Sequence, residues 1–176
     1  MSFFYYDNII RKYEEELNFT PIICHLENLF RISPNEDLLT TLIGASWYYY
    51  IEGNVNQLPV NYDQQLYLRK WKQYIEYGDK KFNESEKFCY IAGYTLSLHG
   101  FHIGKSYEKS GLILMKKCFE ICTNKNLKII AQNFIENEEI KINKKYKAIQ
   151  NSQNICNELF PSNSMLDSYF KEMYLY

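Results

Sequence analysis

The chain has 176 residues, of which 46% are hydrophobic and 23% charged, and its formal net charge is −1. These proportions exclude a wholly disordered chain, and the length is enough for one domain with a sizeable core. The sequence pI is about 6.3, so the chain lacks the strongly basic composition that is typical of nucleic-acid-binding proteins. We therefore expect no direct nucleic-acid partner.

The cysteines and the apolar segments indicate an intracellular setting. Five cysteines, an odd number spread along the chain, do not form a disulfide framework. Charged residues interrupt the apolar N-terminal stretch, so we expect no export signal. The longest uncharged run, 88–104, contains two histidines and three glycines and is shorter than the ~20 mostly apolar residues that span a membrane. We expect a cytoplasmic protein with no membrane partner.

Helix signals begin near the N-terminus. Apolar residues at helical spacing predict a first helix in residues 6–17. Thr20 followed by Pro21 is typical of the start of a second helix, because proline suits the first helical position.

A capping box predicts the start of the third helix. The side chains of Ser33 and Glu36 can each bond the other residue's backbone amide, and Pro34 lies at the first helical position. This helix should run to about Glu52 and stop at Gly53, because glycine commonly follows the last turn of a helix.

Similar signals continue to the C-terminus. Residues 62–77 should form a helix that ends at Gly78, and a second capping box, Asn83 with Glu86, opens a helix that ends near Gly100. Further helices are predicted at 107–122, 127–138, 144–159 and 164–174. No stretch alternates as a strand does, so we predict an all-α, single-domain bundle of about eight helices over residues 1–176.

Two predicted helices carry glycine in their middle, at Gly44 and Gly93. Glycine at such a position costs ~1 kcal/mol relative to alanine. We therefore expect another helix to approach closely at these points. The surrounding segments, 43–45 and 91–93, echo each other as helical pairs do, but two copies are too few to indicate a solenoid.

The aromatic content is high, with 17 tyrosines, 11 phenylalanines and 2 tryptophans. Four aromatic residues, 47–50, follow one another in the third predicted helix, and such a run sweeps too wide an arc to face one core. One interpretation is a helix buried on most sides. The other is that Trp47 and Tyr48 are exposed anchors, the type of residue that dominates protein interfaces.

Charge is distributed unevenly along the chain. Residues 1–63 carry nine acids against three bases, whereas residues 105–150 carry ten lysines against five acids. An acidic end of this kind steers basic partners. An ordinary solvated surface with chance clustering explains the pattern equally well.

Four residues are candidate metal ligands: His99, His102, Cys118 and Cys122. A zinc site needs four convergent ligands, and nothing in this spacing requires the two pairs to meet. Cysteines at helical core positions are usually small hydrophobes. No nucleophile, base and oxyanion donor occur in a recognisable arrangement either. We expect neither catalysis nor a cofactor.

Two segments, 38–50 and 88–98, together with the high use of Asn, Lys, Ile and Tyr, give the chain a family likeness. The chain resembles the small all-helical immunity proteins encoded beside bacterial polymorphic toxins, notably those of contact-dependent growth inhibition. The resemblance implies a protein that binds and neutralises a cognate toxin domain, commonly a nuclease, by occluding its active site or substrate face. It assigns no individual residue a role.

A basic nuclease would be complemented by an acidic, aromatic-rich surface. The candidate partner-binding residues are accordingly Glu14, Glu15, Glu16, Glu36, Asp37, Trp47, Tyr48 and Glu52.

Two other classes of function stay open. A helical adaptor or chaperone-like module would bind several peptides in an aromatic groove. A small-molecule binder or metal enzyme would use His99, His102 and Cys118, and a stoichiometric ion in the purified protein would reveal it.

Overall fold

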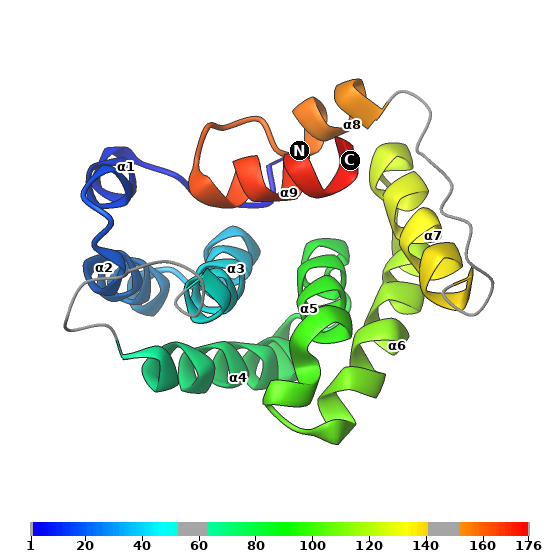
Figure 1. The fold of residues 1–176 in the computed structure, drawn as a ribbon, viewed down its shortest axis with the longest axis horizontal. Helices are drawn as coiled ribbons and strands as arrows, with labels where there is room; N and C mark the ends of the chain where they lie inside the picture. Colours follow the sequence, from blue (N-terminus) through cyan, green and yellow to red (C-terminus); the bar gives the residue numbers. More distant parts are fainter. Residues whose placement is uncertain (1, 53–62, 141–151, 176) are drawn as a thin grey trace.

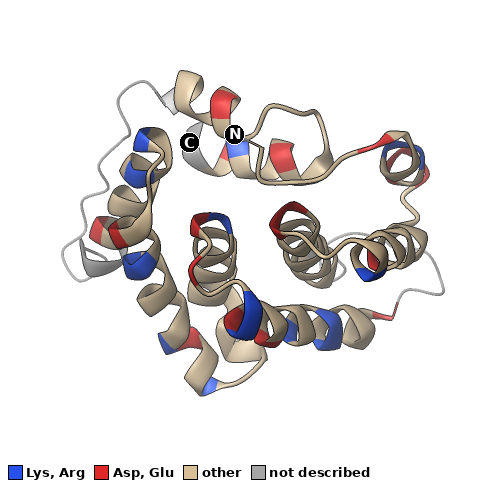
Figure 2. Cartoon of the chain, turned by 180° about the vertical axis from the view of Figure 1, so that it is seen from behind, with Lys and Arg blue, Asp and Glu red and all other residues tan. Residues whose placement is uncertain are grey.

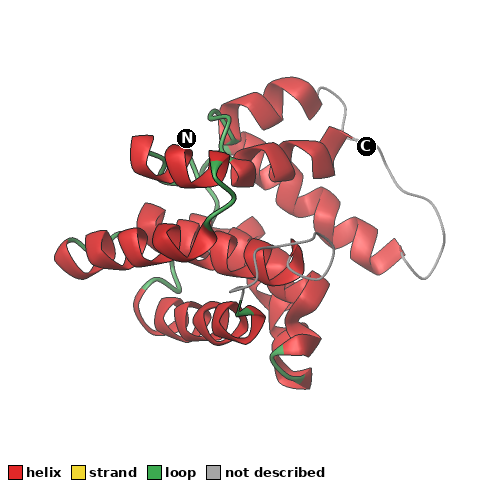
Figure 3. Cartoon of the chain, turned by 60° about the vertical axis from the view of Figure 1, so that its left-hand side comes forward, coloured by secondary structure: helices red, strands yellow, loops and turns green. Residues whose placement is uncertain are grey.

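The computed structural model describes residues 2–52, 63–140 and 152–175. In this part of the chain nine α-helices and one short 3-10 helix form, and no strand occurs (Figure 3). The all-α fold predicted from the sequence is therefore confirmed. In chain order the elements are α1 (Asn8–Glu15), α2 (Phe19–Ile32), α3 (Glu36–Glu52), α4 (Gln64–Lys81), α5 (Glu86–His99), η1 (Gly100–His102), α6 (Lys105–Ile121), α7 (Lys125–Ile140), α8 (Ser152–Leu159) and α9 (Met165–Leu175).

Helices α3 and α5 occupy the middle of the molecule, and the other helices surround them (Figure 1). Ten consecutive residues are buried in each, 38–47 in α3 and 87–96 in α5. Successive helical side chains point about 100° apart, so such a run faces every direction and has to be covered on all sides. Helix α3 packs against α2, α4, α5 and α9, and α5 also packs against α6.

Glycines allow α5 and α6 to approach closely. A Cβ atom on Gly93 would lie 2.9 Å from the backbone nitrogen of Met115, and one on Gly111 would lie 2.3 Å from that of Ser97. The close approach expected at Gly93 is therefore confirmed. At Gly44 the neighbours are side chains, because a Cβ atom there would lie 3.0 Å from the ring of Phe4.

Two of the predicted caps are wrong by two residues. The side chain of Asn35, and not that of Ser33, accepts the backbone N–H of Leu38 at the start of α3 (3.0 Å). Likewise Ser85, and not Asn83, caps α5. Each loop contains two residues that could cap the helix. The residue directly before the helix is the cap, because its side-chain oxygen reaches the second or third helical amide.

Gly78 does not end α4, which continues to Lys81. A Cβ atom on Gly78 would lie 2.1 Å from the ring of Phe88, so the glycine makes room for an α5 side chain. Residues 144–151 of the predicted 144–159 helix and the predicted stop at Gly53 lie outside the described residues.

The contact between α5 and α6 gives a direct test of the packing. We expect Gly111→Ala to destabilise the fold by about 2 kcal/mol or more, because the added methyl group meets backbone rather than a movable side chain. Urea unfolding would measure the change. Ser106→Ala, at an exposed position of the same helix, is the control and should change stability by less than about 0.5 kcal/mol. An equally stable Gly111→Ala variant would contradict the close approach.

Candidate functional site

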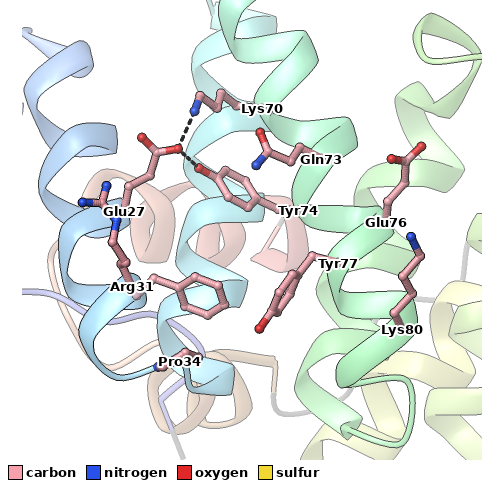
Figure 4. A pocket seen from close by; sticks show the side chains of 10 residues that line it. Glu27, Arg31, Pro34, Lys70, Gln73, Tyr74, Glu76, Tyr77 and Lys80 are labelled. Atoms are coloured by element: carbon pink, nitrogen blue, oxygen red, sulfur yellow. Dashed lines mark hydrogen bonds and ion pairs between the residues drawn. The ribbon is translucent and has the colours of Figure 1, made fainter.

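An open groove of about 660 Å³ lies between α2 and α4 (Figure 4). Helix α2 and the turn that follows it contribute Glu27, Phe30, Arg31 and Pro34, and α4 contributes Lys70, Gln73, Tyr74, Glu76, Tyr77 and Lys80. The volume is within the range of ligand-binding pockets. The lining combines aromatic rings with charges of both signs, and contains no histidine, cysteine, serine or threonine.

The groove exists because α2 and α4 both cover α3, and side chains bridge the space between them. Near one end, Glu27 accepts a hydrogen bond from Lys70 (2.5 Å) and another from the hydroxyl of Tyr74. Further along, the rings of Phe30 and Tyr77 meet edge to face with their centroids 5.3 Å apart.

The contact with Glu27 also affects the pKa of Tyr74. Burial, followed by the hydrogen bond and charge of Glu27, raises the pKa of the Tyr74 hydroxyl far above its usual value. Tyr74 therefore keeps its proton and acts as a donor at neutral pH. The carboxylate of Glu27 is shared between Tyr74 and Lys70, so it is already compensated within the protein.

The remaining charges in the groove are not balanced in the same way. Glu76 accepts a hydrogen bond from the hydroxyl of Tyr107 (2.7 Å) and lies 3.9 Å from Lys72, which is outside the groove. Arg31 and Lys80 have no hydrogen-bond or ion-pair partner among the described residues. Both acids of the groove are thus occupied, whereas two of its three bases are available to a ligand.

Two of the residues predicted to bind a partner are buried instead. Trp47 is 0% exposed, and its indole N–H donates to Nδ1 of His99 (3.1 Å). Glu14 is 8% exposed and accepts the backbone N–H of Met165 at 3.3 Å, at the start of α9. The prediction that either side chain is an accessible contact is wrong. Trp47 is not an exposed anchor because neighbouring helices cover α3 on all sides at this position.

The environment of Glu14 changes its titration. Burial raises the pKa of Glu14 to about 7, and the nearby charge of Asp167 adds to the increase. The amide of Met165 and the hydroxyl of Tyr6 act in the opposite direction. A carboxylate at a helix N-terminus is favoured by the helix dipole, but here desolvation dominates.

Glu36 and Asp37 are partly exposed, but both already contact residues of α5 or its cap. Asp37 is paired with Lys87 of α5, and Glu36 accepts a hydrogen bond from Ser85 (2.6 Å) and lies 3.8 Å from the same lysine. These contacts join the first turns of α3 and α5.

Glu15 and Glu16 are exposed at the end of α1, with no ion-pair partner among the described residues. Tyr48 is half-buried and packs edge to face against Tyr169 (5.5 Å between ring centroids). The side chain of Glu52 lies outside the described residues. Among the seven predicted side chains that the structure describes, two are buried, so these seven do not form one accessible surface.

The candidate metal ligands lie at opposite ends of α5. The thiol of Cys118 donates to the carbonyl of Glu86 in the first turn, whereas His99 is the last residue of the helix. Thirteen residues of helix separate these positions by ~20 Å, so the histidine pair and the cysteine pair cannot share one ion. Across the described residues, no three His, Cys, Asp or Glu side chains form a possible metal site.

No protein-family model, curated protein or solved structure matches the chain. Within the residues that the structure describes, no helix is long and apolar enough to cross a membrane.

The buried carboxylate of Glu14 predicts a pH-dependent stability. Because its folded pKa is about 7, above the ordinary 4.5, Glu14 contributes stability that is complete below about pH 4.5 and is lost as pH rises through about 7. We expect Glu14→Gln to be more stable than the natural protein at pH 8, by roughly 1–2 kcal/mol.

Urea unfolding at pH 5 and pH 8 would measure this effect. The matched control is Glu15→Gln at the exposed neighbouring position, which should follow the natural protein at both pH values. Asp167, whose pKa is also raised by burial, keeps part of the pH dependence in both variants. A Glu14→Gln variant that is less stable at pH 8 would show that the carboxylate, once ionised, is well compensated.

Proposed function

We propose that this chain is a non-catalytic binding protein that neutralises a cognate bacterial toxin domain, with the groove between α2 and α4 as its main contact surface. The observation that carries the proposal is the groove itself. It presents aromatic rings and two uncompensated bases, Arg31 and Lys80, on a scaffold whose two central helices are each buried over ten consecutive residues. Aromatic and arginine side chains are enriched in protein interfaces.

The family likeness supplies the biological setting. A toxin domain, commonly a nuclease, would be bound so that its active site or substrate face is occluded. The five free thiols fit action in the reducing cytoplasm. The charges available at the surface support binding by complementarity of both signs, with Glu15 and Glu16 facing basic groups of the partner and the groove facing acidic ones.

A helical adaptor is the second candidate, and the openness of the groove favours it. A solvent-open channel between two helices has the shape in which helix-in-groove domains hold peptides. The two functions differ in the number of partners, because an adaptor accepts several.

A tagged pull-down from the native host, followed by mass spectrometry, tests the proposal. We expect one stoichiometric partner that survives high salt, is toxic when expressed alone and is harmless when co-expressed with this chain. Several weak partners would favour the adaptor. A single partner without toxicity would overturn the immunity function.

The exposed acids give a kinetic prediction for that partner. We expect the double change Glu15→Lys and Glu16→Lys to slow association about 3- to 10-fold at low salt and to reduce the salt dependence of the rate, because both charges are exposed and steer a basic surface. Stopped-flow or surface-binding kinetics would measure it. Asn157→Lys, at an exposed position of α8, is a control for added positive charge elsewhere. Unchanged rates would exclude these acids from steering.

A further inference from the structure

We infer that the groove between α2 and α4 binds an acidic segment of a partner protein, with an apolar side chain of that segment packed on the groove's aromatic rings. This inference rests on the proposed function only in requiring that the partner be a protein. The groove would prefer an acidic ligand, whereas the negative net charge of residues 1–63 would attract a basic one.

The charge preference follows from what each acid in the groove already contacts. Glu27 is bonded by Lys70 and Tyr74, and Glu76 by Tyr107 with Lys72 nearby. A basic ligand would have to displace one of these contacts. An acidic ligand has no such cost, because Arg31 and Lys80 have no partner among the described residues.

The two available bases come from opposite walls. Arg31 lies in the last turn of α2, and Lys80 lies near the end of α4, across the groove from it (Figure 4). A ligand that contacts both bases therefore crosses the groove. A guanidinium group forms paired hydrogen bonds with a carboxylate, and a lysine adds a point charge.

The apolar part of the ligand would meet the edge-to-face pair of Phe30 and Tyr77. Both rings are half-buried and line the groove, so part of their surface remains available. Aromatic side chains in such positions are frequent centres of binding energy. A peptide with an apolar side chain between two acidic ones would match the order of bases and rings across the groove.

A peptide fits this site better than a nucleic acid. A phosphate backbone carries regularly spaced negative charge, and it would meet the carboxylates of Glu27 and Glu76 in the same groove as the two bases. A peptide can place its carboxylates opposite Arg31 and Lys80 alone. The openness of the groove to solvent also suits a continuous segment better than a small enclosed ligand.

Selection from a random-peptide display library on the full-length protein tests the inference without the natural partner. We expect the selected peptides to carry net negative charge and at least one large apolar residue. Their affinity, measured by fluorescence anisotropy, should fall at least about tenfold in the double variant Arg31→Glu, Lys80→Glu, and should weaken as salt rises.

The matched control is Lys81→Glu, an exposed charge reversal at the end of α4 that does not line the groove. It should change affinity by less than about twofold. All three substituted positions are exposed, so each variant should fold, and urea unfolding would verify this.

Three results of the peptide experiments would overturn the inference: selected peptides that are basic or neutral, acidic peptides that bind the double variant as tightly as the natural protein, or no selected peptide. Self-association that disappears in the double variant would identify a second copy of the chain as the occupant and would also overturn it. A toxic partner that binds the double variant normally would exclude the groove as its contact surface and would leave only the neutralisation of a toxin from the proposed function. A partner without toxicity that binds the double variant much more weakly than the natural protein would support the groove and overturn the immunity function.

Discussion

Burial of ten consecutive residues in each of α3 and α5 is the constraint on which the rest of the structure depends. A helix covered on every side can place charged side chains only at its ends, and this is where Glu36, Asp37 and Lys87 lie. The remaining charged residues lie mainly on the surrounding helices (Figure 2). The groove has the same origin. Covering α3 requires both α2 and α4, and two helices laid on a third leave a channel that side chains such as Glu27 and Tyr74 partly bridge.

Several acids of residues 1–63 form contacts within the molecule. Asp7 lies 2.8 Å from His25, Glu27 is bonded to Lys70, and Asp37 is bonded to Lys87, so acids of the first third of the chain join helices together. Partly buried pairs of this kind contribute little net stability when desolvation is included. An acidic segment of sequence therefore need not become an acidic face.

The fold class and the order of helices could be predicted from the sequence, because the helical period and the scarcity of strand patterns are local properties. The burial of Trp47 was one of two interpretations of a four-residue aromatic run, and only the packing of neighbouring helices decides between them. The groove could not be predicted, because Glu27 and Lys70 are 43 positions apart and their contact depends on which helices are neighbours. The same limit applies to Glu14, whose position in an acidic run gave no sign that α9 covers it.

The abundance of tyrosine has a structural explanation that does not require an aromatic interface. Several tyrosine hydroxyls reach from one helix to a polar group on another, as Tyr67 does with Thr20, Tyr74 with Glu27 and Tyr107 with Glu76. The hydrogen bond to Glu76, followed by burial, raises the pKa of Tyr107 to about 12, so this hydroxyl remains a donor at neutral pH. Tyrosine thus fills core volume and joins helices with the same side chain.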